Sequence, residues 1–375
     1  MSLTTEAVIV GAGIVGAACA YELAKEKIKV TILDGSGIGT GATAAGMGHI
    51  VAMDDSDAQF ALTRYSQQLW EKLKEECPST VEYQQSGTIW VAADEEEMAE
   101  VRRKHEYYKV RGIPSEVLDS AALAEAEPSL RKPLAGGLRV PGDAVIYPPC
   151  AATFLIEKAQ RLGARIHIGK NVVSVRKGKA LLSDGTSLCA KIIVNATGQF
   201  APKLTPGIDI RPRKGHLVIT DRYPGKIRHQ LVELGYLKSA HSTSADSVAF
   251  NLQPRKTGQL LIGSSRQYER EDSGVDGEIL DKMLRRAFVY LPDLAALSAI
   301  RVWTGFRAAT PDKLPLIGPW PADSSVFLAA GHEGLGITTS LATGRLVADH
   351  FLGRKPEIPS EPYLPSRQQE AVGHA

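Results

Sequence analysis

A glycine-rich turn near the N-terminus is the first feature with a chemical use. It reads Gly11-Ala12-Gly13-Ile14-Val15-Gly16 and follows a predicted strand at residues 6–10 that is apolar after Glu6. The first glycine permits a tight turn, the second lets the backbone approach a pyrophosphate, and the third lets the next helix pack on the strand. A second apolar run, residues 29–33, ends at Asp34, whose carboxylate can accept a hydrogen bond from a ribose hydroxyl. This order of elements predicts a dinucleotide-binding βαβ unit; the alternative is a purely structural one.

Three later segments favour FAD over NAD as the dinucleotide. Residues 39–47 carry almost no side-chain bulk, so their backbone could lie along an extended cofactor; a flexible linker is the alternative. A buried-looking strand at 192–195 ends in Ala196-Thr197-Gly198, and residues 330–337 form a glycine-rich strand-to-helix turn. The N–H groups of that turn could face the negative charge that develops on a reduced flavin. An NAD-dependent dehydrogenase stays open as a third interpretation of the chain.

Arg307 is the candidate for binding a substrate carboxylate. It follows a predicted strand at 300–306, and a guanidinium can hold a carboxylate through two parallel hydrogen bonds. A structural ion pair between lobes is the alternative. His49 follows the glycine-rich loop and could face the same substrate, although it could equally be a hydrogen-bonding filler. Residues 211–214 hold a basic cluster, Arg211, Arg213 and Lys214, that is most simply a solvated face; a phosphate or partner site is the alternative.

The length of the chain predicts that two lobes position these residues, because 375 residues exceed what one core usually supports. Rossmann-like pieces lie at both ends of the chain and in its middle. We therefore expect an α/β (α+β) fold with a Rossmann-like FAD-binding domain and an inserted antiparallel-sheet substrate domain. The FAD-binding domain would comprise residues 1–80, 140–210 and 311–375. The substrate-binding domain would comprise residues 81–139 and 211–310, with β segments at 216–220, 248–253 and 260–263.

Composition argues against several other classes of protein. The net charge is +2 with both signs interspersed, so nothing suggests a nucleic-acid partner or a charged membrane surface. The longest apolar stretch, residues 7–21, is interrupted by glycines and is shorter than the roughly 20 residues of a membrane span. The four cysteines are scattered without metal-ligand spacing, so we expect no metal site, reduced thiols and a cytoplasmic location.

Six segments together resemble the glycine oxidase and D-amino-acid oxidase-like (DAO) family of FAD-dependent oxidoreductases. The family also includes sarcosine oxidases and the flavin subunits of opine oxidase, hydrogen cyanide synthase and D-hydroxyproline dehydrogenase. Within it, the Gly-His-Glu-Gly-Leu-Gly-Ile-Thr turn is most similar to those flavin subunits, with D-hydroxyproline dehydrogenase as the nearest in kind. The segments are GAGIVG at 11–16, GTGATAAGM at 39–47, NATG at 195–198, PRKTGQLLIGSS at 254–265, WTGFRAATPDKLPLIG at 303–318 and AAGHEGLGITTSLATG at 329–344.

The resemblance implies a bound FAD and the residues that would hold it. Relatives with covalent FAD use a cysteine after the Trp-x-Gly-x-Arg strand or a histidine before the Ala-Ala-Gly run. Residues 308–312 contain no cysteine and Thr43 stands at the histidine position, so the flavin is expected to be non-covalent. The expected cofactor residues are Gly11, Gly13, Ile14, Val15, Gly16, Asp34, Gly35, Thr40, Thr43, Ala44, Ala45, Gly46, Met47, Val173, Ala196, Thr197, Gly198, Arg307, Gly331, His332, Gly334, Leu335, Gly336 and Ile337.

The resemblance also implies the reaction: hydride transfer from the α-carbon of a small amino or imino acid to flavin N5, giving an imine. We expect a D-hydroxyproline- or D-proline-like substrate, Arg307 as its carboxylate ligand, and partner subunits that carry further redox centres. Glycine oxidases have a tyrosine where this chain has Asn251, which puts glycine itself in doubt; Asn251 or Gln253 could supply a neutral donor instead. The alternatives are a glycine- or sarcosine-type oxidase that uses O2, and a non-catalytic FAD-carrying relay or scaffold subunit.

Overall fold

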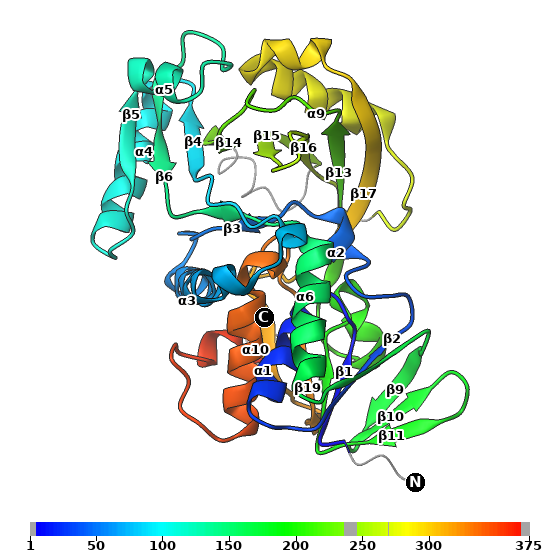
Figure 1. The fold of residues 1–375 in the computed structure, drawn as a ribbon. Coiled ribbons are helices and arrows are strands. Elements are labelled where there is room, and N and C mark those ends of the chain that lie inside the picture. Colours follow the sequence, from blue (N-terminus) through cyan, green and yellow to red (C-terminus); the bar gives the residue numbers. More distant parts are fainter. Residues whose placement is uncertain (1–4, 236–245, 269, 369–375) are drawn as a thin grey trace.

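Two large β-sheets organise the chain, as the computed structural model in Figure 1 shows. The structure describes residues 5–235, 246–268 and 270–368. The six-stranded sheet, in the lower half of the view, carries the glycine-rich turns, and the eight-stranded sheet lies above it. Each sheet has its own apolar core. The predicted fold class, a Rossmann-like unit joined to a second, largely antiparallel sheet, is confirmed.

The six-stranded sheet is parallel except for its edge strand β18. Its central strands are short, apolar and buried on both faces, as parallel strands covered by helices must be. In order across the sheet the strands are β18 (Leu316–Trp320), β19 (Asp323–Ala330), β12 (Ile192–Asn195), β1 (Ala7–Val10), β2 (Val30–Asp34) and β8 (Arg165–Ile168). A separate three-stranded antiparallel sheet contains β9 (Val172–Arg176), β10 (Lys179–Leu182) and β11 (Ser187–Cys189).

Helices rich in small and apolar residues cover this sheet. Helix α1 (Ile14–Lys25) packs against both α6 (Pro148–Arg161) and α10 (Gly336–Phe351), and α10 also contacts α3 (Asp57–Leu73). The α1–α10 contact is close enough to need a glycine: a Cβ on Gly344 would lie 2.6 Å from the Ala18 carbonyl oxygen. The remaining short helices are α2 (Ala42–Ala45), α7 (Ala201–Leu204) and the 3-10 turns η1 (Lys74–Glu76), η2 (Ser79–Val81), η3 (Gly198–Phe200), η4 (Pro292–Ala296) and η5 (Glu361–Tyr363).

The eight-stranded sheet is antiparallel with one exception, the parallel pair β14–β4. Helix α9 (Gly277–Tyr290) contacts β15 and β16, while α4 (Glu95–Lys109) and α5 (Ser120–Ala126) lie near β4 to β6. In order the strands are β17 (Ala299–Ala309), β13 (Arg211–Thr220), β16 (Leu260–Arg266), β15 (Ser247–Pro254), β14 (Gln230–Glu233), β4 (Thr88–Ala92), β6 (Gly136–Val140) and β5 (Glu116–Asp119).

The chain passes between the two sheets more than once. The strands of the six-stranded sheet come from the segments expected to bind the cofactor, and those of the eight-stranded sheet come from 81–139 and 211–310, apart from Val140. A two-stranded ribbon, β3 (His49–Ile50) with β7 (Ala144–Val145), also pairs segments far apart in sequence. The domain boundaries themselves stay a prediction. No helix among the described residues combines the length and apolar character needed to cross a bilayer.

Gly344→Ala tests the close α1–α10 contact. Alanine favours a helix over glycine by about 1 kcal/mol, but here its methyl group would meet the Ala18 backbone. We expect a net loss of about 1–3 kcal/mol in the free energy of unfolding, because the helices must separate. Denaturant unfolding measures it. Gly277→Ala is the matched control, since nothing lies within 4 Å of its Cβ position. Equal stability of the two variants would contradict the contact.

Candidate functional site

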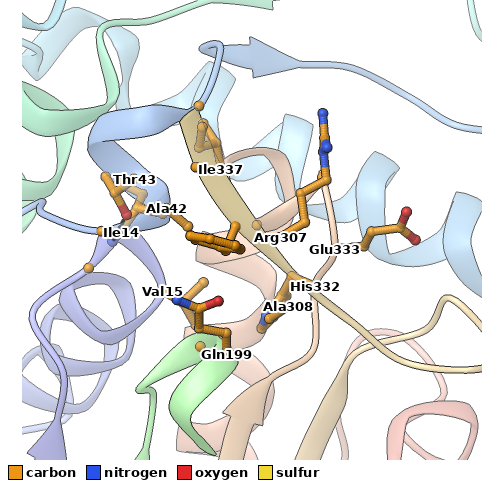
Figure 2. Close-up of a pocket in the computed structure, with 18 of the residues that line it drawn as sticks. Ile14, Val15, Ala42, Thr43, Gln199, Arg307, Ala308, His332, Glu333 and Ile337 are labelled. Carbon is orange, nitrogen blue, oxygen red and sulfur yellow. Dashed lines mark hydrogen bonds between the residues drawn. The ribbon is translucent and has the colours of Figure 1, made fainter. Parts of the chain in front are cut away.

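One large cavity, of about 680 Å³, connects the first glycine turn to the eight-stranded sheet. That size suits an organic cofactor together with a small ligand. Figure 2 shows Ile14, Ala42 and Thr43 on one side of the cavity and Arg307 with Glu333 on the other. The three glycine-rich segments expected at a dinucleotide, 39–47, 196–198 and 331–337, all contribute to its lining. The cavity therefore brings the predicted cofactor and substrate residues into one site.

The turn after β1 is built from glycines that no other residue could replace without a shift. Gly11 has φ +107°, and a Cβ on it would lie 2.6 Å from the Ala196 carbonyl oxygen. A Cβ on Gly16 would lie 2.0 Å from the Gly11 carbonyl oxygen, so Gly16 supports the turn and does not itself line the cavity. Gly13 does line it and sits at the N-cap of α1. Gly11 and Gly16 thus have the turn and packing roles that the sequence predicts, while the approach of Gly13 to a pyrophosphate stays a prediction.

Asp34 holds two turns together at the end of β2. Its Oδ2 accepts a hydrogen bond from Ala12 N at 2.7 Å, and its Oδ1 accepts from Ser36 N at 2.7 Å and Gly37 N at 2.8 Å. The carboxylate also lines the cavity beside Gly35. Since a carboxylate has about four acceptor sites, Asp34 can stabilise the turns and still accept from a ribose hydroxyl.

The loop at 39–47 is an ordered part of the wall rather than a linker. Thr43 Oγ1 accepts a hydrogen bond from Ile14 N at 3.0 Å, which attaches the short helix α2 to the first turn of α1. On the other side, Trp303 Nε1 donates to the Ala45 carbonyl at 3.2 Å. A Cβ on Gly305 would lie 2.4 Å from the Ala45 Cβ. The loop thus fits between the Rossmann-like unit and strand β17.

Two helix N-termini open into the cavity, and in neither does the N-cap residue, Gly13 or Leu335, supply a capping side chain. Helix α1 begins after Gly13 and α10 begins after Leu335, and residues of both first turns line the cavity. Backbone N–H groups and the positive end of the helix dipole favour anions at such positions. An extended FAD fits this arrangement: its pyrophosphate would lie at α1 and the carbonyl edge of its flavin at α10. Glycine backbone on both sides leaves room for such a ligand.

Two of the cavity histidines, His49 and His332, are neutral over most of the pH range. Burial lowers the pKa of His332 to about 3 and the pKa of His49 to about 4. The Thr343 hydroxyl donates to the Thr339 carbonyl at 2.9 Å, so it accepts from His332 Nε2, also at 2.9 Å. The backbone carbonyl of His49 accepts from the Thr338 hydroxyl, and the ring Nε2 of His49 has no hydrogen-bond partner among the residues that the structure describes.

Arg307 projects from β17 into the cavity, and its guanidinium lies next to a glycine of the neighbouring strand β13. A Cβ on Gly215, its neighbour on β13, would lie 2.5 Å from Arg307 Nη1. Arg307 Nη1 also donates to the Ser265 carbonyl at 2.9 Å. The guanidinium is thereby held between the eight-stranded sheet and Gly334, whose Cβ position is 3.7 Å from Arg307 Nε. This places a fixed cation next to the N-terminal turn of α10.

The interpretation of Arg211, Arg213 and Lys214 as a solvated face is wrong for two of the three. Arg213 is 7% exposed and forms an ion pair with Glu333, and Lys214 is 2% exposed and pairs with Asp272 at 2.8 Å. Burial of these long side chains requires the carboxylate partners, which lie far away in sequence. Only the Arg211 side chain is extensively exposed.

Most of the expected site residues lie on the cavity. Asn251 and His49 line it, whereas Gln253 does not, because its Oε1 accepts from Gly48 N at 2.9 Å. Ala44 and Val173 are also absent from the lining; Val173 is 52% exposed and its neighbour Val172 lines the cavity instead. The sequence interpretation missed other lining residues, namely Trp90, Gln199, Phe200, Lys203, His216, Gln230 and Val232. Gln230 and Val232 alternate along β14, a strand that was not expected.

Comparisons with known proteins agree with this geometry. The family model described as FAD dependent oxidoreductase (DAO) matches residues 6–350. Glycine oxidase of Geobacillus kaustophilus is 29% identical, covering 97% of each chain. Hydrogen cyanide synthase subunit HcnC of Pseudomonas aeruginosa is 26% identical, covering 98% of this chain and 97% of that protein. The crystal structure of L-proline dehydrogenase from P. horikoshii superposes with a TM-score of 0.88 at 26% identity, covering 99% of each chain.

The buried, neutral state of His332 predicts a pH dependence of stability. Its folded pKa, about 3, lies below the ordinary value of 6.5, so below pH 6.5 the unfolded chain binds the proton preferentially. Stability from this group is complete above pH 6.5 and falls by up to about 1.4 kcal/mol per pH unit below it. Relative to His332→Gln, the wild type should lose unfolding free energy between pH 6.5 and 4.5 in denaturant titrations. A pH-independent difference would contradict the assignment.

Proposed function

The chain belongs to the family of FAD-dependent oxidoreductases, and we propose that it oxidises a small amino or imino acid of the D-hydroxyproline or D-proline type to its imine. The observation that carries this proposal is a guanidinium, that of Arg307, held in the same cavity as the N-terminal turns of α1 and α10. FAD, when bound, supplies the hydride acceptor at N5. The protein has to bind the carboxylate, orient the α-carbon and exclude water.

Arg307 is suited to the carboxylate because its position is determined by the surrounding backbone. Gly215 leaves space for the guanidinium and the Ser265 carbonyl orients Nη1, so little side-chain freedom remains to be lost on binding. A planar fork of N–H donors matches the two oxygens of a carboxylate better than a lysine ammonium would. Neutral His49 and Asn251, which also line the cavity, add no charge that would compete for that carboxylate.

The cofactor assignments follow from the same cavity. We propose that Gly11, Gly13, Ile14 and Asp34 hold the adenosine and pyrophosphate half of FAD, and that the segments 43–47 and 331–337 hold the flavin. Thr197 and Gly198 border the same space. Gly16 would act through the turn that it supports, and Ala44 through α2. Val173 would need its backbone rather than its exposed side chain to contact the adenine.

We further propose that the chain works as the catalytic flavin subunit of a heteromeric dehydrogenase in the cytoplasm. Its similarity to a hydrogen cyanide synthase subunit supports a multi-subunit enzyme. The described residues hold no group of three His, Cys, Asp or Glu that could bind a metal ion, so electron transfer to a metal centre would need a partner chain. The alternative, an oxidase of the glycine type that uses O2, is supported by the similarity to glycine oxidase.

Arg307→Ala tests the carboxylate site. Removing the Arg307 guanidinium, which the Ser265 carbonyl orients, should cost about 3–5 kcal/mol of binding to a carboxylate substrate. The expected result is a large rise in KM for D-proline with FAD still bound, measured by steady-state kinetics and flavin absorbance. Arg211→Ala is the matched control, because that arginine is exposed and pairs with Asp209. An unchanged KM in Arg307→Ala would rule out this role.

The purified chain alone, assayed with an artificial electron acceptor, tests the reaction class. We expect it to reduce the dye with D-proline and D-hydroxyproline and to use glycine and sarcosine poorly, because Asn251 stands in the cavity where glycine oxidases have a tyrosine. Oxygen consumption measured in parallel distinguishes a dehydrogenase from an oxidase. Fast O2-dependent oxidation of glycine would favour the oxidase alternative. A flavin-loaded chain that oxidises none of the four would favour the relay or scaffold alternative.

A further inference from the structure

His216 is a fully buried histidine on β13 that borders the cavity. The hydrogen bonds of its two ring nitrogens establish which nitrogen carries the proton. Asp276 N donates to His216 Nε2 at 3.0 Å, so Nε2 carries no proton. The proton of the neutral ring is therefore on Nδ1, which donates to the Ser265 hydroxyl oxygen at 2.9 Å. Burial, followed by the charge of Lys214, lowers the pKa of His216, in agreement with this neutral form.

The Ser265 hydroxyl oxygen accepts a second hydrogen bond from His216, this time from its backbone N–H at 2.9 Å. Two donors from one residue occupy both lone pairs of that oxygen, so the side chain of Ser265 has one orientation. The carbonyl of the same serine accepts from Arg307 Nη1 at 2.9 Å. A continuous series of hydrogen bonds thus runs from His216 through Ser265 to Arg307.

The far end of the series is also anchored. Asp276 caps α9, and its carboxylate accepts from Glu278 N and Ile279 N. The backbone N–H of Asp276, which donates to His216, therefore lies at the N-terminus of α9, and α9 packs on β15 and β16. The guanidinium of Arg307 is consequently connected to a rigid helix outside the cavity.

We propose that His216 is a positioning residue for substrate binding: acting through Ser265, it holds the Arg307 guanidinium in the orientation that receives the substrate carboxylate. The inference rests on the proposed role of Arg307 and adds a specificity to it. Loss of His216 should weaken the binding of carboxylates while leaving the FAD site and the binding of uncharged analogues unchanged. Neither Ser265 nor Asp276 needs to touch the substrate for this effect.

The probe is pyrrole-2-carboxylate, a planar ring carboxylate without an α-hydrogen to transfer, and its binding is followed by the change in flavin absorbance of the FAD-loaded chain. We expect His216→Ala to raise its dissociation constant about tenfold, as expected for one lost hydrogen bond to the network. Pyrrole-2-carboxamide, which lacks the charge, should bind equally to both forms. His216→Asn should restore most of the affinity, because its amide nitrogen can replace Nδ1 as the donor to Ser265.

Ser265→Ala gives a second, smaller change in the same series, in case His216→Ala does not fold. It should weaken carboxylate binding as His216→Ala does, because the two donors of His216 then have no acceptor. Thr220→Val is the control: Thr220 is a buried β13 residue that accepts from Leu260 N at 3.0 Å outside the cavity lining, so its loss should leave the dissociation constant unchanged.

A double-mutant cycle decides whether His216 acts through Arg307. In an Arg307→Lys background the effect of His216→Ala on carboxylate binding should disappear, because no guanidinium remains to be oriented. An equal loss in both backgrounds, or an equal loss for the carboxamide, would overturn the positioning role and leave the proposed function standing. An Arg307→Lys variant that binds pyrrole-2-carboxylate as tightly as the wild type would overturn the proposed carboxylate site itself, together with this inference.

Discussion

The site depends on a contact that excludes side chains: the crossing of the β1–α1 turn over the end of β12. A Cβ on Gly11 or Gly16 would overlap a carbonyl oxygen, at 2.6 Å and 2.0 Å respectively. Because no atom stands between these backbones, the first turn of α1 opens directly into the cavity. The anion-binding capacity of the helix end follows from this close approach rather than from any charged residue. Asp34 then holds the turn in place through Ala12 N.

The second sheet contributes Arg307, the cation proposed to bind the substrate carboxylate. Strand β17 carries Arg307, and its neighbour β13 provides the glycine that leaves space for the guanidinium. The same pair of strands holds buried charges nearby, Arg213 with Glu333 and Lys214 with Asp272. Burying these charges is tolerable only because each is paired, and the pairs join β13 to the turn before α10 and to the segment before α9. The cation of the site is therefore part of a paired and ordered network.

Local signals predicted which glycine-rich segments meet at the cavity. The glycine spacing at 11–16, the acid at Asp34 and the glycine-rich turn at 331–337 each depend on neighbours close in sequence, and the structure brings them together. The substrate half depends on strand pairing between distant segments. Strand β14 was missed because its four residues have no distinctive pattern, and its partner β4 lies more than a hundred residues earlier. The burial of Arg213 and Lys214 was missed for the same reason, since Glu333 and Asp272 become neighbours only in the fold.

The direct contact between Gly305 and Ala45 constrains how such a protein could diverge. Strand β17 touches the loop of residues 39–47 through Gly305 and Trp303 and bears Arg307 two residues later. Any substitution that adds a side chain at Gly305 would displace both the loop and Arg307. Gln230 and Val232 of β14 line the cavity from a different strand of the same sheet. Substitutions at those two buried positions would alter the cavity wall without replacing a residue of the β17–loop contact.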